Sequence, residues 1–373
     1  MKIDHDNPPG AGTQVASATR PVKAGYTRAL DIRHGVVDMS HGAGGKAAAQ
    51  LIAELFAPEL ANPFLGQGDD GAALPLPGFD PAGGELVMAT DAHVVSPLFF
   101  PGGDLGCLAV HGTINDVAML GARPLYLSAS FILEEGFALA DLQRLVRSMG
   151  RAAAEAGVPV VTGDTKVVER GKGDGVFIST TGVGVRAPGL AIGGAQARAG
   201  DAILVSGTVG DHGLAVLSQR ESLAFDTTIV SDTAALHTLV ADLLAAAPGG
   251  VRVLRDPTRG GLATTLNEIA QQSGVGMRLQ EAAIPVTPQV DAACELLGLD
   301  PLYVANEGKL IAICAPEAAE VVLGAMRRHP LGQQAARIGT VTTDPHHFVQ
   351  MDTRFGGRRV VDWLSAEPLP RIC

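Results

Sequence analysis

Residues 85–95 read ELVMATDAHVV, an apolar run of strand-like character that ends at the acidic residue Asp91. The same pattern returns in VPVVTGDTK, residues 158–166, where the run ends at Asp164. Short apolar runs bounded by turn residues are typical of buried β-strands. Further strand-like runs and the helical stretches between them occupy the rest of this half: 105–121, 125–133, 138–157 and 176–185. Strands interleaved with helices in this way predict an α/β domain.

A second set of elements follows a change in composition near Arg186. Residues 187–201, APGLAIGGAQARAGD, are rich in Gly and Ala and indicate a loop. Strand-like runs then extend from AILVSG to RRVVDWL, with helical stretches between them. We therefore expect an α/β (α+β) protein with two domains of mixed sheets flanked by helices. The expected limits are a disordered N-terminal extension at 1–33, an N-terminal domain at 34–186, a C-terminal domain at 187–362 and a flexible tail at 363–373.

The composition is that of a globular protein without a membrane span. Of 373 residues, 46% are hydrophobic and 18% are charged, and no apolar stretch approaches the length of a transmembrane helix. The formal net charge of -11 argues against nucleic-acid binding but is compatible with nucleotides that carry a metal cation. No secretory signal is recognised at the start, and the four cysteines show no CxxC spacing. We expect a cytoplasmic protein with reduced thiols that binds neither nucleic acid nor membranes.

Aspartates recur in four short segments of the first half: GQGDDGA, ATDAHVV, GTINDVA and TGDTK. In each segment an acidic residue lies where a strand or helix meets a turn: Asp70, Asp91, Asp116 and Asp164. Mg²⁺ prefers oxygen ligands and usually takes a few carboxylates together with nucleotide phosphates. A single Asp–Gly or Gly–Asp pair more often marks only a turn. Four such segments in one domain favour a metal–nucleotide site with these aspartates as ligands.

Glycine-rich loops precede three helical stretches. The first, SHGAGGKAA, is not a P-loop, because Lys46 is followed by Ala47 and the required earlier glycine is missing. It still offers backbone N–H groups to a phosphate, and Lys46 and Asn115 join the aspartates as candidate nucleotide contacts. SGTVGDHG and DPTRGGL have the same design. Each loop by itself is more often a tight turn than a phosphate cradle.

The combination GDDGA…TDAHVVSP…NDVAMLGARP…TGDTK resembles the ATP-binding half of the aminoimidazole ribonucleotide synthetase (PurM-like) superfamily. With GDHG, DPTRGGL, VANEGK and the terminal PRIC, residues 34–373 are most similar to the HypE family of carbamoyl dehydratases. The resemblance implies a PurM-like fold, a homodimer in which the N-terminal sheets of two subunits pair, and ATP and Mg²⁺ bound mainly by the N-terminal domain. It also implies metal and phosphate roles for four aspartates: Asp70, Asp91, Asp116 and Asp164.

The same resemblance implies a reaction on the last residue. In the family, the terminal cysteine receives a carbamoyl group from the carbamoyltransferase HypF, and the S-carboxamide is dehydrated to a thiocyanate. The cyano group then passes to iron held by the HypC–HypD complex, for assembly of the [NiFe]-hydrogenase iron centre. A carboxamide oxygen is a poor leaving group. Transfer of the γ-phosphoryl group of ATP to that oxygen makes it part of a phosphate, and Mg²⁺ neutralises the charge that develops.

Four residues are candidates for catalytic roles in such a reaction. Cys373 would carry the carbamoyl group on an arm that two prolines hold extended, and Arg371 would contact phosphate or lower the thiol pKa. Glu307 in VANEGK and Lys166 in TGDTK are candidates to remove the nitrogen protons. Glu307 precedes an apolar strand, where burial would raise its pKa. Glu307 and Lys166 could instead be solvated charges in loops. His93 is a candidate to position the carbamoyl group, and the alternative is that it is merely hydrogen-bonded.

Two other functions remain open from the sequence. A small-molecule kinase or ATP-dependent ligase of the same superfamily, such as thiamine-monophosphate kinase, would not need the thiol of Cys373. A non-catalytic scaffold whose tail only docks onto a partner would tolerate Asp91→Asn and Asp164→Asn together. A terminal cysteine taken alone indicates a frayed end, but the motifs of the two domains favour the dehydratase.

Overall fold

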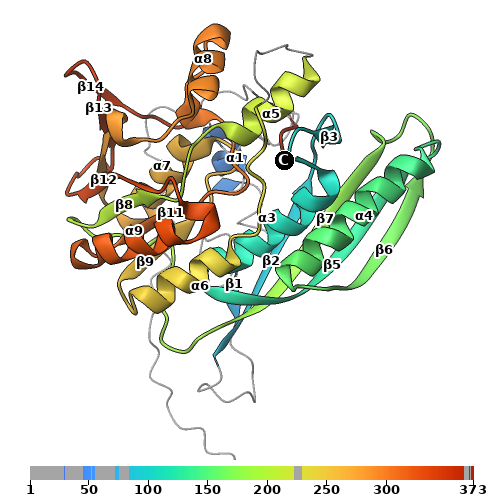
Figure 1. Ribbon diagram of the computed structural model, residues 1–373, viewed down its shortest axis with the longest axis horizontal. Helices are drawn as coiled ribbons and strands as arrows, with labels where there is room; N and C mark the ends of the chain where they lie inside the picture. Colours follow the sequence, from blue (N-terminus) through green and yellow to red (C-terminus); the bar gives the residue numbers. More distant parts are fainter. Residues whose placement is uncertain are drawn as a thin grey trace, which may run out of the picture.

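The computed structural model describes residues 45–51, 53–54, 72–74, 84–221, 229–364, 369 and 371–373, together with residue 29. Within these residues the chain forms a five-stranded sheet and a seven-stranded sheet, each with helices packed against it (Figure 1). The loop after Arg186 separates the strands of the first sheet from those of the second. The prediction of an α/β protein with two mixed sheets flanked by helices is therefore confirmed.

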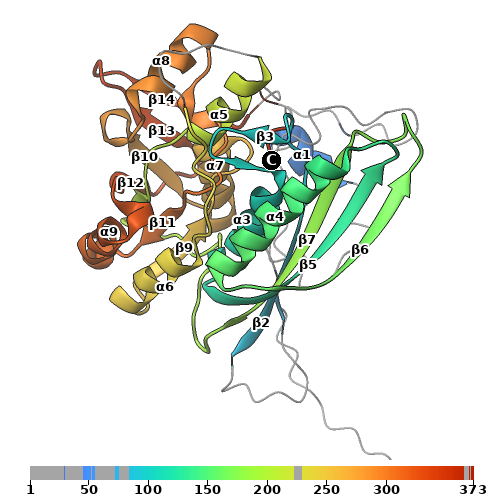
Figure 2. The ribbon, with the colours of Figure 1, turned by 45° about the vertical axis from the view of Figure 1, so that its right-hand side comes forward.

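The N-terminal sheet has the strand order β1-β2-β7-β5-β6, in which β5 and β6 are parallel and the other neighbours are antiparallel. Its strands are β1 (Ala72–Leu74), β2 (Glu85–His93), β5 (Ala122–Glu134), β6 (Val160–Val168) and β7 (Val176–Arg186). The other elements of this half are α1 (Lys46–Leu51), β3 (Phe99–Phe100), β4 (Gly103–Asp104), α3 (Leu105–Met119) and α4 (Leu139–Ala156). A parallel strand pair needs a crossover connection, which α4 supplies between β5 and β6. Helices α3 and α4 cover one face of the sheet (Figure 2).

The other face of the N-terminal sheet is open among the residues that the structure describes. Side chains alternate between the two faces of a strand, so that Val87 and Ala89 of β2 are buried whereas Met88 is 44% exposed. Met88, Val183 and Tyr126 are register partners across β2, β7 and β5, and they place apolar surface on the open face. Strand β6 forms an edge of the sheet and is exposed over nearly its whole length.

Helix α3 is fixed at its start and lies close to the sheet. The Asp104 side chain accepts hydrogen bonds from the backbone N–H groups of Gly106 (2.9 Å) and Cys107 (3.1 Å), which a helix would otherwise leave unpaired. Gly182 of β7 permits the close approach, because a Cβ there would lie 2.9 Å from Thr113 Cγ2. The helix therefore packs directly over the end of β2, where the first acidic motif lies.

The C-terminal sheet has the strand order β14-β13-β10-β12-β8-β11-β9. Its strands are β8 (Ala202–Val205), β9 (Val251–Arg255), β10 (Gly276–Gln280), β11 (Ile311–Cys314), β12 (Ala336–Thr342), β13 (Val349–Asp352) and β14 (Arg358–Val360). Its helices are α5 (Asp211–Arg220), α6 (His237–Ala246), α7 (Gly261–Ser273), α8 (Pro288–Leu297) and α9 (Ala319–Arg328), with short 3-10 turns at Glu281–Ala283, Pro301–Tyr303, Pro316–Ala318 and Pro330–Gly332. Strands β8 and β11 are apolar and buried throughout, because α7 packs on one face of the sheet and α6 and α9 pack on the other.

The two halves share a buried core at their junction. Ile114 of α3 and Leu214 of α5 belong to one apolar cluster, which also includes Leu369 and Ile372 from the end of the chain. The C-terminus accordingly lies between the two halves, near β3 and α5 (Figure 1). The C-terminal residue Cys373 is thus surrounded by elements of both halves.

Candidate active site at the C-terminus

The last residues are held as a short strand beside the end of β2. The Val94 N–H donates to the Cys373 carbonyl (2.9 Å) and the Ser96 N–H donates to the Arg371 carbonyl (3.0 Å). The residues between them form an antiparallel β-bridge. The described part of the tail is therefore docked into the junction, and the predicted mobility of residues 363–373 stays a prediction.

Docking places the Cys373 thiol beside the Glu307 carboxyl group, which raises the pKa of the thiol further above the rise that burial causes. Glu307 is 3% exposed, as the apolar run after it predicts, and its Oε1 has no hydrogen-bond partner among the described residues. Burial raises the pKa of Glu307 well above its ordinary value, and the neighbouring carboxylates of Asp256, Asp91 and Asp232 raise it further. Two acids thus face each other in a buried pocket, and burial favours the protonated form of both.

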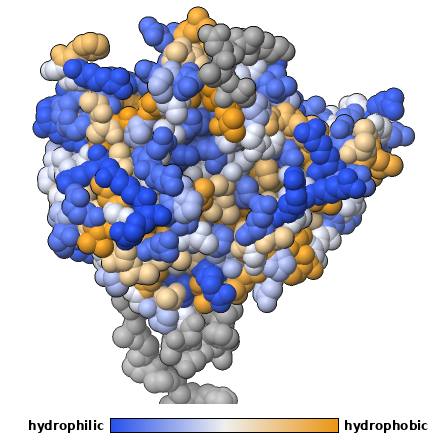
Figure 3. All heavy atoms as spheres, viewed as in Figure 1, coloured by the Kyte–Doolittle hydropathy of each residue, from blue (hydrophilic) through white to orange (hydrophobic). Residues whose placement is uncertain are grey.

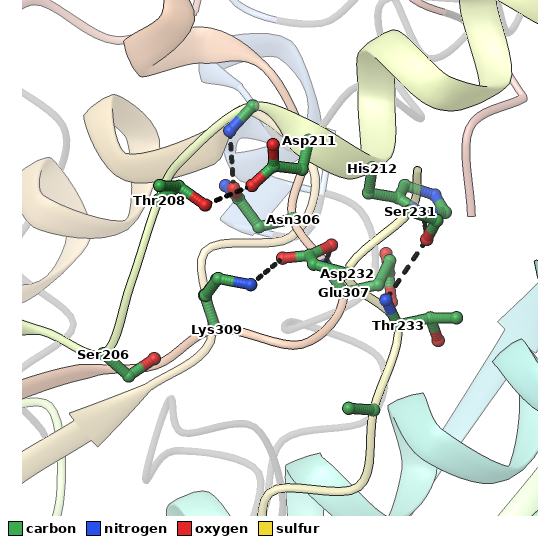
Figure 4. Close-up of polar contacts among 12 residues, drawn as sticks. Ser206, Thr208, Asp211, His212, Ser231, Asp232, Thr233, Asn306, Glu307 and Lys309 are labelled. Atoms are coloured by element: carbon green, nitrogen blue, oxygen red, sulfur yellow. Dashed lines mark hydrogen bonds and ion pairs between the residues drawn. The ribbon is translucent and has the colours of Figure 1, made fainter. Parts of the chain in front are cut away.

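The backbone of Glu307 is fixed from both halves of the molecule. Its N–H donates to Asp232 Oδ1 (3.0 Å), and its carbonyl accepts from Asn115 Nδ2 (3.2 Å) on α3. The preceding residue, Asn306, accepts from the Gly210 N–H (2.7 Å) at the start of α5. Figure 4 shows Asp232 beside Glu307, with Lys309 paired to Asp232 at 3.1 Å. The loop that carries Glu307 is consequently held in one conformation.

His93 is 1% exposed and directly precedes Val94, whose N–H donates to the Cys373 carbonyl. Its Nε2 lies 3.1 Å from Thr180 Oγ1, which donates its own proton to the Ala109 carbonyl (2.9 Å). The hydrogen-bond network therefore assigns the ring proton to Nε2 and leaves the lone pair of Nδ1 unpaired, 3.6 Å from Asp91 Oδ2. Burial lowers the pKa of His93, while the Asp91 carboxylate opposes this shift. A neutral His93 thus offers one free acceptor to a group in the pocket.

The cation near the thiol is not the one expected from the sequence. Burial raises the pKa of Cys373, and the guanidinium of Arg259 opposes the rise. Arg371 forms an ion pair with Asp174 instead, so the expectation that Arg371 lowers the thiol pKa is wrong for the docked tail. The physical reason is local: Arg371 has a φ of 57°, which breaks the extended geometry that would place side chains 371 and 373 on one face.

Asp91 and Asp116 lie on the same side of α3. A Cβ at Gly112 of α3 would lie 3.5 Å from Asp91 Oδ2 and 3.0 Å from His93 Cε1, so this face of the helix looks onto the end of β2. Asp116 follows Gly112 by four residues and therefore lies on the same helix face, one turn further on. These two of the four predicted metal ligands are brought to one region.

Asp164 and Lys166 lie on the opposite face of the N-terminal sheet. In the strand register Asp91 lies opposite Thr180, whose side chain contacts α3. Asp164 lies opposite Ser130, which in turn lies opposite Ser179, and the side chains of this row point to the open face. Three strand spacings, about 14 Å in all, also separate β2 from β6. The Lys166 ammonium hydrogen-bonds Asp164 (2.6 Å) and lowers the pKa of its carboxyl group. Within one chain, these two residues are not brought to the Cys373 site.

The three other residues predicted to contact the nucleotide or metal are Lys46, Asn115 and Asp70. Lys46 is exposed and pairs with Asp362 (3.1 Å). Asn115 is buried and uses its amide to join the halves: Nδ2 donates to the Ala234 and Glu307 carbonyls, and Oδ1 accepts from the Leu236 N–H (2.8 Å). Both Nδ2 donors are therefore used, and with these bonds intact Asn115 could contact a nucleotide only as an acceptor, through the second lone pair of Oδ1. Asp70 lies outside the described residues.

Four residues of the site were not singled out by the sequence: Asp232, Asp256, Arg259 and His212. Arg259 and Asp256 occur in DPTRGGL, and His212 occurs in GDHG, where the glycines drew attention and the polar side chains did not. A charged residue that accompanies a glycine-rich turn is a usable signal. Asp232 stands in the segment IVSDTAAL, which has no recognisable motif.

A magnesium nucleotide is compatible with the carboxylates present. Among the described residues, no three His, Cys, Asp or Glu side chains form a closed metal cluster. Mg²⁺ in nucleotide sites is instead held by one or two carboxylates together with phosphate oxygens. Asp91 and Asp116, which the helix spacing assigns to one side of α3, are candidates for such carboxylates. These residues therefore fit the open form of site that a metal-bound nucleotide completes.

Comparisons with known proteins agree with this architecture. AIR synthase related protein, N-terminal domain, matches residues 68–186, and AIR synthase related protein, C-terminal domain, matches residues 198–352. The carbamoyl dehydratase HypE of Cupriavidus necator is 72% identical over 352 residues, which are 94% of this chain and 99% of that protein. Two solved structures are also similar. A HypE–HypF complex contains a chain that is 46% identical with a TM-score of 0.79, over 84% of this chain and 99% of that one. A HypE in complex with ATP is 52% identical with a TM-score of 0.75, over 91% and 100% of the two chains.

None of the described helices combines the length and the apolar character that crossing a bilayer requires.

Proposed function

This chain belongs to the HypE family of carbamoyl dehydratases, which serve hydrogenase maturation, and we propose that its substrate is the S-carboxamide of its own Cys373. The proposed product is a thiocyanate, and ATP is the co-substrate, as the ATP complex of a similar HypE supports. The observation that carries the proposal is the contact between the Cys373 thiol and the buried carboxyl group of Glu307. A group attached to that sulfur would lie beside Glu307 and near the end of β2, which carries His93.

The proposed dehydration removes one oxygen and two nitrogen protons from the carboxamide. Bound ATP with Mg²⁺ supplies the γ-phosphoryl group that lets the oxygen leave as phosphate. The carbon–oxygen bond breaks, and the electrons of the two N–H bonds complete the carbon–nitrogen triple bond. The chain itself has to bind the tail, accept the protons and keep water out, and the candidate metal contacts for this step are Asp91 and Asp116.

Glu307 is the proposed acceptor of nitrogen protons. A base is most effective when its pKa lies near the working pH, and burial together with three neighbouring aspartates moves the pKa of Glu307 in that direction. His93 is the proposed positioning group, because its unpaired Nδ1 accepts an N–H of the carboxamide. Such a bond would orient the nitrogen towards Glu307.

The proposed homodimer pairs the open faces of two N-terminal sheets. On the side of the molecule that carries α4 and α9, hydrophilic and hydrophobic residues alternate in small groups (Figure 3). The open face instead presents Met88, Tyr126 and Ile132, each more than two-fifths exposed, beside the unpaired edge of β6. Exposed apolar surface and a long sheet edge both favour association with another surface. In this dimer, Lys166 and Asp164 would serve the partner's site.

Two partners follow from the family. HypF is the proposed carbamoyl donor, since a similar HypE forms a complex with HypF. An iron-carrying HypC–HypD complex is the proposed acceptor of the cyano group. Both would meet Cys373 with the tail undocked, because the docked thiol faces Glu307 between the two halves of the chain.

Intact-mass spectrometry tests the proposed function. Incubation with HypF and its substrates should add one carbamoyl group to the wild-type chain and none to the Cys373→Ser variant. Addition of ATP and Mg²⁺ should then remove the mass of one water. A persistent carbamoyl adduct in the presence of ATP would refute the dehydratase chemistry on this residue. A small-molecule kinase would keep its ATP turnover without Cys373, and a scaffold would turn over no ATP.

A further inference from the structure

Two side chains of α5 hold the backbone of the docked tail. His212 Nε2 lies 2.7 Å from the Ile372 carbonyl, and Arg220 Nη2 donates to the Arg371 carbonyl at 2.7 Å. Arg220 Nε also donates to the Ser96 carbonyl (2.7 Å), so one guanidinium joins the tail to the strand beside it. Neither residue belongs to the machinery proposed above. Both come from the segment GDHGLAVLSQR, in which the sequence indicates only a glycine-rich loop and a helix.

The hydrogen bonds of His212 fix which of its nitrogens is the donor. The Ile372 carbonyl can only accept, so Nε2 carries the proton. Nδ1 must then accept from Ser231 Oγ (2.8 Å), and that oxygen in turn accepts from the Thr233 N–H (3.2 Å). Figure 4 shows His212, Ser231 and Thr233 side by side. Burial lowers the pKa of His212 and keeps the ring neutral. The ring is therefore a preset donor towards the tail.

The segment that orients His212 also places the proposed base. Ser231 bonds His212, and the next residue, Asp232, accepts the N–H of Glu307 (3.0 Å) and pairs with Lys309. The docked tail and the carboxyl group that faces it are consequently fixed by consecutive residues of one extended segment. A movement of this segment would therefore shift both the docked tail and the Glu307 carboxyl group.

We propose that His212 and Arg220 form a docking site for the tail backbone, with Ser231 orienting His212, so that the Cys373 sulfur is positioned whatever group it carries. The role of this site in dehydration rests on the proposed function, whereas the docking of the tail rests only on the hydrogen bonds of His212 and Arg220. The two contacts of the site go to the carbonyls of residues 371 and 372. The tail is also held by the Val94 N–H at the Cys373 carbonyl and by the buried side chain of Ile372, so the contact between the sulfur and Glu307 lies outside this backbone site. The thiol, carboxamide and thiocyanate forms should therefore dock alike. Release of the product must then come from competition for the tail rather than from the reaction itself.

Thiol alkylation of the full chain measures docking without any dehydratase chemistry. The docked Cys373 is partly buried, so iodoacetamide should reach its sulfur faster when the tail is out, and peptide mapping separates its adduct from those of the other three cysteines. Arg220→Met keeps the side-chain stem but removes both donors, and loss of bonds to a charged donor should raise the Cys373 alkylation rate about tenfold or more. His212→Leu should do the same. His212→Gln retains an N–H donor near the Nε2 position and should stay near wild type, as should the surface control Arg328→Met.

Amide hydrogen exchange of the peptide that contains Val94 and Ser96 tests the second half of the proposal. Both N–H groups donate to the tail, so their exchange should be unchanged in Cys373→Ala and faster in Arg220→Met. Wild-type alkylation and exchange in Arg220→Met would overturn the docking site, whatever a dehydration assay gives. Faster exchange in Cys373→Ala would overturn the claim that docking ignores the sulfur. If docking behaves as expected but the carbamoylated wild type never loses water, only the proposed function fails.

Discussion

Substitution of Glu307 by Gln separates the proposed chemistry from the packing of the pocket. Gln has nearly the same shape, and the two bonds that hold this position, from the backbone to Asp232 (3.0 Å) and Asn115 (3.2 Å), do not involve the side chain. Gln cannot take up a proton from nitrogen. Removal of a general base typically lowers a rate by about 10²- to 10⁴-fold, and we expect a loss in this range for the dehydration step.

The same substitution should leave the chain as stable as the wild type, or more stable, at neutral pH. Burial and the nearby aspartates raise the pKa of Glu307 well above 4.5, so the native state holds the proton more tightly than the unfolded state. A group of this kind contributes stability below its unfolded pKa and loses that contribution as the pH rises through its native pKa. Gln has no such loss. The difference in Tm, variant minus wild type, should therefore increase as the pH rises from 4.5 towards neutrality.

The assay follows the carbamoyl adduct of a preloaded chain by intact mass after ATP and Mg²⁺ are added, with thermal unfolding measured over the same pH range. Glu320→Gln, an exposed carboxylate on α9, is the matched control and should change neither readout. Dehydration by Glu307→Gln within about a factor of ten of wild type would show that Glu307 is not the base. A Tm difference that falls with increasing pH would show that the pKa of Glu307 is not raised in the native state.

Three further outcomes follow from the site. The acid limb of the pH–rate profile for dehydration should lie above the ordinary range of a glutamate, and Asp232→Asn should move that limb to lower pH, because it removes one of the negative charges that raise the pKa of Glu307. Gly112→Ala should lower the dehydration rate while carbamoylation of the tail continues, since its Cβ would lie 3.0 Å from His93 Cε1 and displace the ring; unchanged dehydration would remove His93 from the mechanism. Lys166→Met should be inactive alone, and mixing it with Glu307→Gln under conditions of subunit exchange should restore part of the activity. No recovery would contradict a site completed by the partner's Lys166.

Much of the fold can be predicted from the sequence, because apolar runs and helix-ending glycines act within a single helix or strand. The runs at 125–133 and 176–185 became β5 and β7, and the stretch at 138–157 became α4, which ends at a left-handed Gly157 as the glycine predicts. The prediction is poorer for β6, because the apolar run ends at Asp164 whereas the strand continues to Val168. Pairing with β5 along its whole length extends it, and that long-range contribution is not encoded in the run itself.

The site was only partly predictable for the same reason. Burial of Glu307 follows from the apolar strand after it, but the face on which Asp164 lies depends on the register of β5 with β6 and β7, and β5 shifts register between residues 127 and 128 in its pairing with β6. Asp232 and His212 gain their roles only from partners more than 70 and 150 residues away along the chain, respectively. Spacing rules describe neighbours in sequence or on one element, so contacts of this range lie beyond them.

The docked tail also explains how a reactive thiol can be carried safely. A thiolate is the nucleophilic form of cysteine, and burial beside Glu307 raises the pKa of Cys373. The docked position therefore favours the protonated thiol, the less nucleophilic form, and this effect of burial is lost when the tail undocks. In the proposed reaction, carbamoyl transfer to Cys373 would occur on the undocked tail, and dehydration would occur on the docked one. The pocket that disfavours the charge of a free thiol does not disfavour a neutral carboxamide, because there is no ionised form to desolvate. Burial thus disfavours the thiolate of an unmodified Cys373 in the docked position, but it does not oppose docking of the S-carboxamide form.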